Sequence, residues 1–163
     1  MDAQQLHDHI IKPTLEYMGG NYDSKNARML LLATAAIESH CGHYLVQKGG
    51  PALGPWQMEP ETHDDIWDNC DALKSDYFAE RIDKLSDDIV WSHDYQFLIN
   101  CLPYACTMAR LKYSMDKEAL PSYDEPYEIY RYYKRVYNTH LGASTWDKFQ
   151  AAWSECGLDK VVL

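Results

Sequence analysis

The chain has 163 residues, a length typical of one domain around one core, so we expect a single domain spanning residues 1–163. Hydrophobic residues make up 46% and charged residues 25%, a composition that excludes an intrinsically disordered chain. There are 25 Asp and Glu against 15 Lys and Arg, and the net charge of -10 argues against nucleic-acid binding while leaving an uncharged polymer such as a polysaccharide open.

Apolar residues recur with helical spacing along the chain, and no segment of useful length alternates as a β-strand does, so the predicted fold class is all-α. Pro13 is expected to bend the first helix and Pro103 to kink the longest one. Segment 43–60 is rich in Gly and Pro and is predicted to be an irregular loop. The expected helices are 3–18, one from Asp23 or Ser24 to about His40, 61–68, 75–86, 94–116, 126–139, and one from Ser144 or Thr145 to about Cys156.

No membrane span is expected, because the longest apolar run, Met29 to Ile37, is far shorter than the roughly 20 residues that a membrane helix needs. The first residues carry neither a basic start nor an apolar stretch, so no secretory signal peptide is expected and the chain is predicted to be made in a cytoplasm. Five cysteines, an odd number without CxxC spacing, indicate reduced thiols.

Glu38 is the strongest candidate in the sequence for a catalytic residue. It shares a helix face with Leu31, Thr34 and Ala35. Burial of a carboxylate costs several kcal/mol unless it is paired, and the negative end of the helix dipole disfavours it further. Both effects raise the pKa of a carboxyl group, which suits a general acid. The alternative is a glutamate that reaches solvent at a frayed helix end.

The residues that follow carry a family resemblance. Glu38–Gly42 reads ESHCG, and after a Gly-rich loop Gly54–Thr62 reads GPWQMEPET. These stretches resemble the Glu-Ser helix end and the Gly-Leu-Met-Gln-hydrophobic-x-Pro-x-Thr-like segment of the lytic transglycosylase and goose-type lysozyme superfamily. Val136–Thr139, VYNT, matches the family's Ala-Tyr-Asn-Ala-Gly only in part. The resemblance is close over roughly residues 27–65 and loose over 95–145.

The resemblance implies a lysozyme-like helical fold, no cofactor, and cleavage of the β-1,4 bond between N-acetylmuramic acid and N-acetylglucosamine in peptidoglycan. Glu38 would protonate the leaving oxygen and then take the proton of the muramyl 6-hydroxyl as a 1,6-anhydro ring closes. By the same resemblance, Ser39 would orient the substrate's acetamido group or Glu38, Gln57 and the backbone near Met58 would line the sugar subsite, Tyr137 would hydrogen-bond near Glu38, and Asn138 would hold the loop or contact sugar.

Glu59 departs from the transglycosylase pattern, which has a hydrophobic residue there, and goose-type enzymes carry an acid at the corresponding place. It could be the second carboxylate with which an inverting lysozyme activates water, or a solvated loop residue. Trp56 suggests a surface for stacking on sugar, or a lid over the core. Tyr130, Tyr133 and Tyr137 share a helix face that could wall the groove, where Arg131, Lys134 and Arg135 would add positive charge. His63-Asp64-Asp65 is not expected to bind a metal ion, because consecutive residues of a helix point in different directions.

Two classes of function therefore remain. The first is an enzyme that cuts peptidoglycan glycan strands, with a transglycosylase mechanism favoured over hydrolysis. The second is a structural virion protein on the same fold, associated with other virion proteins, although a scaffold has no physical reason to keep Glu38 with Ser39. A helix-turn-helix DNA binder is excluded because no helix is basic. A wall-cutting enzyme without a signal peptide is typical of a phage, as a virion component or an endolysin acting on the periplasmic wall.

Overall fold

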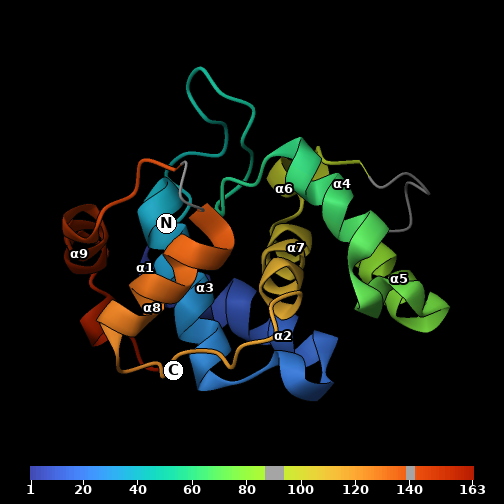
Figure 1. The fold of residues 1–163 in the computed structure, drawn as a ribbon, viewed down its shortest axis with the longest axis horizontal. Helices are drawn as coiled ribbons and strands as arrows, with labels where there is room; N and C mark the ends of the chain where they lie inside the picture. The colour runs from blue at the N-terminus through green and yellow to red at the C-terminus, as the bar shows by residue number, and fades with distance from the viewer. Residues whose placement is uncertain (87–93, 139–141) are drawn as a thin grey trace.

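A computed structural model describes residues 1–86, 94–138 and 142–163. Over these residues the chain is all-α, as predicted, and extended pairing is limited to isolated bridges of Leu53 with Val46 and with Met58. In this part of the chain no helix combines the length and the apolar composition that a membrane span requires. The helices are α1 (Ala3–Leu6), α2 (Lys12–Met18), α3 (Lys25–Ser39), α4 (Pro60–Asn69), α5 (Asp76–Asp83), α6 (Phe97–Asn100), α7 (Leu102–Ser114), α8 (Pro126–Tyr133) and α9 (Trp146–Glu155) (Figure 1).

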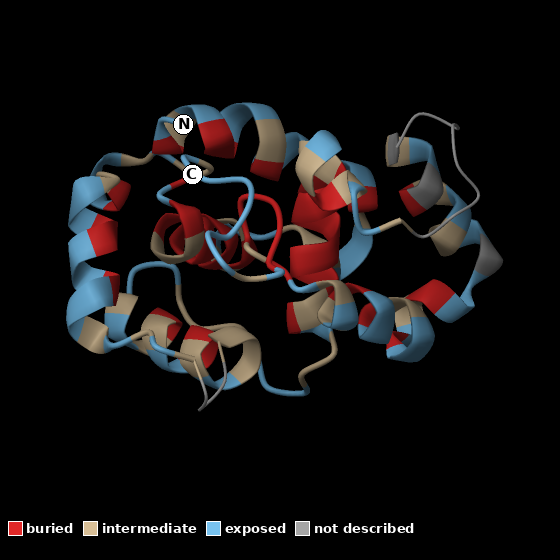
Figure 2. Cartoon of the chain, turned by 90° about the horizontal axis from the view of Figure 1, so that it is seen from above, coloured by how far each residue is buried: buried red, intermediate tan, exposed pale blue. Residues whose placement is uncertain are grey.

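Helix α3 is the central element of the fold. It contacts α1, α7, α8 and α9, so helices from both ends of the sequence pack around it. In Figure 2 the buried residues gather in the middle of the molecule and the exposed ones cover its outer faces. Every residue from Met29 to Ala36 is buried, whereas the sequence predicted burial of one apolar face. These residues are apolar on all sides of the helix, and such a helix is covered by other elements on all sides.

The ends of α3 follow from its flanking residues. Ser24 caps the first turn by accepting a hydrogen bond of 3.1 Å from the backbone N–H of Ala27. His40 takes the left-handed conformation directly after the helix, with φ 48°, and Gly42 follows with φ 78°. The predicted boundaries are therefore confirmed, and the reversal after Ser39 places Glu38 at the exposed end of an otherwise buried helix.

The prediction of one kinked helix over 94–116 is wrong. Helix α6 ends at Asn100, Cys101 is extended, and α7 begins at Leu102 with Pro103 in its first turn. Proline is tolerated in a first turn because the N–H it lacks has no helical partner there, whereas in a helix interior it breaks the hydrogen-bond ladder. Pro103 thus marks the start of a separate helix rather than a bend within one helix.

The other proline-containing helices are closer to prediction. The chain is helical from Ala3 to Met18, and its irregularity is a π-helical segment, His7–Ile11, directly before α2, which has Pro13 in its first turn. Helix α8 continues as a second π-helical segment, Lys134–Asn138. The predicted end of that helix at residue 139 lies outside the described residues. Thr145, one of the two expected caps, accepts from the backbone N–H of Lys148.

The loop after α3 folds back against the core through Leu53, Gly54 and Trp56. Leu53 and Met58 exchange two backbone hydrogen bonds of 2.9 Å. A Cβ at position 54 would overlap the carbonyl oxygen of Leu98, so glycine is required where this loop touches α6. Trp56 is 1% exposed and donates from its indole nitrogen to the Leu31 carbonyl at 2.9 Å. Of the two alternatives for Trp56, a stacking surface for sugar is therefore wrong, and the residue belongs to the core.

Candidate active site

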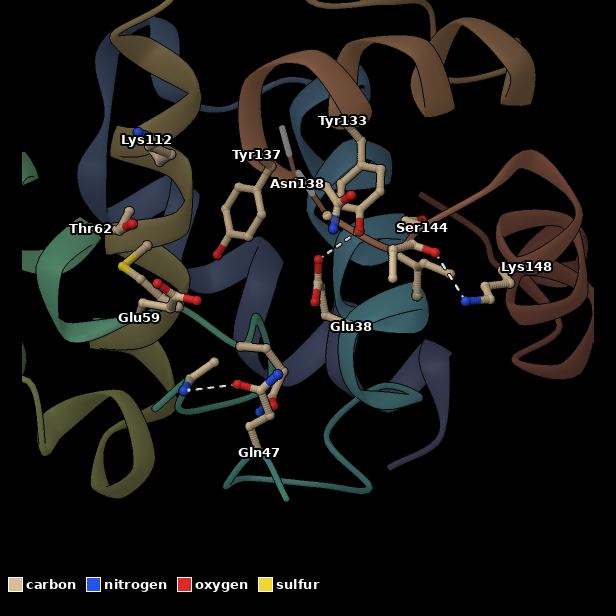
Figure 3. A pocket seen from close by; sticks show the side chains of 16 residues that line it. Glu38, Gln47, Glu59, Thr62, Lys112, Tyr133, Tyr137, Asn138, Ser144 and Lys148 are labelled. Atoms are coloured by element: carbon tan, nitrogen blue, oxygen red, sulfur yellow. Dashed lines mark hydrogen bonds between the residues drawn. The ribbon is translucent and has the colours of Figure 1, made fainter. Parts of the chain in front are cut away.

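A cavity of about 610 Å³ opens at the end of α3. That helix end and the loop that precedes α4 form part of its walls. Further wall residues come from α7, from α8 with the π-helical segment after it, and from the beginning of α9 (Figure 3). Of the residues predicted for the site, Glu38, Gln57, Met58, Glu59, Tyr137 and Asn138 line the cavity and Ser39 does not. Residues far apart in the sequence are therefore brought together around one carboxyl group.

Glu38 is half-buried in the cavity wall. The phenol of Tyr133 donates a hydrogen bond of 2.6 Å to Glu38 Oε1 (Figure 3). Burial raises the pKa of Glu38, while the hydrogen bonds with Tyr133 and Asn138 and the charge of Lys134 partly oppose that rise. The net shift is upward, so the carboxyl group keeps its proton to higher pH than an exposed glutamate and can donate it to a bound molecule.

The tyrosine that holds Glu38 is Tyr133, not Tyr137 as the resemblance implied. Tyr137 lies one helical turn further on, stacks on Tyr113 at 5.3 Å between ring centroids, and donates 2.9 Å to the Trp56 carbonyl. It therefore joins the cavity wall to the loop. Helical spacing puts Tyr133 on the groove-facing side of its helix but does not predict its contact with Glu38, because spacing identifies a face and not a partner.

Of the two roles that the resemblance implied for Ser39, the structure does not support contact with the substrate's acetamido group, and orientation of Glu38 stays open. It is fully buried, lies 2.5 Å from the Pro55 carbonyl oxygen through its hydroxyl, and accepts from the backbone N–H of Gly42 at 2.8 Å. These bonds fix the reversal after α3 and attach it to the loop that forms the opposite wall. Ser39 thus holds the backbone next to Glu38, without lining the cavity.

The loop side of the cavity is formed by Gln57, Met58 and Glu59. Gln57 has a positive φ of 44° and donates from its side-chain amide to the Gly54 carbonyl at 2.7 Å. Met58 is almost completely buried. Glu59 is exposed, makes no side-chain capping bond to α4, and lies across the cavity from Glu38 in Figure 3. A carboxylate with no fixed partner is less well oriented than Glu38.

Lysines contribute the positive charge of this region. Lys134 donates to Asn138 Oδ1 and to the Gly142 carbonyl, both at 2.7 Å, so this lysine links Asn138 to Gly142. Lys148 donates to the Ala143 carbonyl at 3.0 Å. Lys112 is half-buried on the cavity wall and has neither a hydrogen bond nor an ion pair within the described part of the chain. It is the lysine best placed to meet an anionic group in the cavity.

The other basic residues expected to line the groove are neutralised. Arg131 pairs with Glu128 at 3.2 Å. Arg135 pairs with Asp116 and Glu118, each at 2.7 Å. The surface positive patch is thus a set of ion pairs on a solvated helix face.

His63 is a buried structural residue that bonds to Asp64 and, at 2.8 Å, to the Tyr104 hydroxyl. Within residues 1–86, 94–138 and 142–163, no group of three or more His, Cys, Asp or Glu side chains could hold a metal ion. Comparison of the chain with protein-family models, with curated proteins and with solved structures gives no match.

Proposed function

We propose that the protein cleaves the β-1,4 bond between N-acetylmuramic acid and N-acetylglucosamine in peptidoglycan as a lytic transglycosylase. The observation that carries the proposal is Glu38, a half-buried carboxyl group of raised pKa, held by Tyr133 in an open cavity. Such a group suits protonation of a glycosidic oxygen. The Glu-Ser and Gln-Met-x-Pro-x-Thr resemblance supplies the substrate class. A phage virion or a phage endolysin is the proposed setting.

In the proposed reaction Glu38 gives its proton to the leaving oxygen as the glycosidic bond breaks. The substrate's own acetamido oxygen closes on the muramyl C1, so no nucleophile from the protein is needed. The Glu38 carboxylate then takes the proton of the muramyl 6-hydroxyl, which attacks C1 and displaces the acetamido oxygen. Between these steps the Tyr133 hydroxyl stabilises the carboxylate, and Glu38 ends protonated as it began.

The products are predicted to end in 1,6-anhydromuramic acid, and Glu59→Gln is predicted to keep activity within about threefold of the parent. Glu59 is exposed and across the cavity, and the 6-hydroxyl replaces the water that a second carboxylate would activate. The measurement is mass spectrometry of muropeptides released from purified cell walls, where an anhydro end is lighter than a reducing end by one water.

An inverting lysozyme gives the opposite pair of results. Loss of a general base costs about 10²- to 10⁴-fold, so an inactive Glu59→Gln protein together with reducing-end products would assign the chain to hydrolysis. Walls left uncut by the folded parent protein, under conditions where a control lysozyme cuts them, would favour the structural virion protein instead.

Peptidoglycan also carries carboxylates on its lactyl and peptide groups, and Lys112 is placed to meet one. Lys112→Met is predicted to raise KM for cell walls about fivefold with little change in kcat, since one partly exposed ion pair contributes about 1 kcal/mol. Lys117→Met is the matched control, because it removes the same charge from an exposed position that does not line the cavity.

Walls with chemically amidated carboxylates separate this effect from a change of fold. The parent and Lys112→Met proteins should then have the same KM, because the charge that Lys112 recognises is gone. A KM that stays different on amidated walls, or one raised equally in Lys117→Met, would show that Lys112 does not contact a substrate carboxylate.

A further inference from the structure

Two thiols far apart in the sequence meet where the end of α3 lies beside the end of α9. Cys41 follows α3, is fully buried, and has a left-handed backbone conformation with φ 55°. Cys156 directly follows α9 and is half-buried. Helices α3 and α9 are in contact, and His40 and Glu155, the residues next to the two cysteines, approach to 3.6 Å. The two thiols influence each other's ionisation, and neither is in a disulfide. The five cysteines are all free thiols, as predicted from the sequence.

The surroundings make the two thiols unequal. Its hydrogen bond with Cys41, together with the bond and charge of His40, lowers the pKa of Cys156 to about 6. The same contact with Cys156 and burial raise the pKa of Cys41. The nucleophilic thiolate form is therefore favoured at Cys156, and the protonated thiol is favoured at Cys41. His40 lies 3.6 Å from Glu155, which keeps the imidazole beside the pair.

The pair is also accessible to small molecules. A second cavity of about 450 Å³ is lined by Cys156 together with His40, His43, Tyr44 and Glu155. It shares no lining residue with the cavity of Glu38. A small oxidant can thus reach Cys156 without entering the candidate active site, while Cys41 is covered and reachable only through its neighbour.

We propose that Cys156 and Cys41 are a redox-active pair that reacts with hydroperoxides and closes into a disulfide joining α9 to the end of α3. The Cys156 thiolate attacks the outer oxygen of the hydroperoxide, the O–O bond breaks, and the leaving alkoxide or hydroxide takes a proton from solvent to become an alcohol or water. Cys156 is then a sulfenic acid. The Cys41 sulfur attacks it, loses its own proton, and water leaves.

The reaction consumes one hydroperoxide, which is reduced, and oxidises two thiols to one disulfide. The pair would stay reduced in a cytoplasm and close in an oxidising compartment. This inference does not depend on the proposed glycan cleavage, because it uses a separate cavity and separate residues.

The test is a thiol count on denatured protein before and after treatment of the folded, reduced protein with one equivalent of hydrogen peroxide. We expect five thiols to fall to three, with a Cys41–Cys156 cross-linked peptide in the mass spectrum. Cys101→Ser is the matched control, since Cys101 is half-buried and bonds to the Leu85 carbonyl away from the pair, and it should still lose two thiols.

Three variants test the order of the steps. Cys156→Ser should lose no thiols to one equivalent of peroxide. Cys41→Ser keeps a hydrogen-bond donor beside Cys156 but cannot form the disulfide, so it should accumulate a sulfenic acid at Cys156 that dimedone labels. His40→Asn should slow the reaction several-fold at pH 7 and recover at pH 9, where the thiolate forms without a neighbouring imidazole. Thiol loss in Cys156→Ser equal to that of the parent, or cross-links that join two chains instead of Cys41 to Cys156, would overturn the proposal.

Discussion

Glu38→Gln is expected to lower the rate of muropeptide release from cell walls by about 10³-fold or more. General acid catalysis alone is worth about 10²- to 10⁴-fold, and in the proposed reaction the same side chain transfers a proton in both steps. Glutamine keeps the shape of the side chain and can still accept the hydrogen bond from Tyr133, but it has no proton to give. The loss should therefore be in kcat, with KM changed much less.

The same substitution is expected to leave the free energy of unfolding unchanged or higher at pH 7. The pKa of Glu38 is raised in the folded protein, so the parent protein loses stability as pH rises from the unfolded value of about 4.5 through the folded value. Glutamine removes this loss, and below the unfolded value the two proteins should differ little. Urea unfolding at pH 4 and pH 7 checks both the fold and the sign.

Glu61→Gln is the control for Glu38→Gln, because Glu61 is exposed on α4 and does not line the cavity. It should retain the activity of the parent protein. A folded Glu38→Gln protein that still clears a wall suspension would remove Glu38 from the reaction and with it the proposed function.

Tyr133→Phe is expected to lower kcat by about 10- to 100-fold, because a hydrogen bond to a charged group is worth roughly 1.5–3 kcal/mol. The bond of 2.6 Å stabilises the Glu38 carboxylate that forms when the proton has been given away. Without it the pKa of Glu38 rises further, since burial then acts with less opposition. The alkaline limb of the kcat/KM profile should therefore move to higher pH as the rate falls.

Rate measurements from pH 4 to pH 9 test this shift, which a merely structural role of Tyr133 would not produce. Tyr130→Phe is the matched control, because Tyr130 lies on the same helix but packs its ring against Trp146 and Phe149. Its profile should coincide with that of the parent protein. A Tyr133→Phe profile reduced in height with an unmoved alkaline limb would contradict the assignment of Tyr133 as the partner of Glu38.

Sequence alone determined the features that depend on neighbours along the chain. Helical periodicity, the cap at Ser24 and the turn at Gly42 predicted α3 and the place of Glu38 at its end, and the structure confirms them. The desolvation expected for Glu38 is confirmed as well, in the direction of its pKa. Local patterns are reliable here because caps, dipoles and side-chain spacing act within one or two helical turns.

Tertiary structure decided the features that depend on contacts between distant segments. Helical spacing could not choose Tyr133 over Tyr137 as the partner of Glu38, because that choice depends on how α8 packs against α3. Ser39 and Trp56 have side chains suited to sugar, yet both are buried and bond to backbone carbonyls that only the folded loop brings near. The pairing of Cys41 with Cys156 has the same origin. Contacts throughout the core contribute to the packing energy, so a short stretch of sequence does not contain the information that selects these partners.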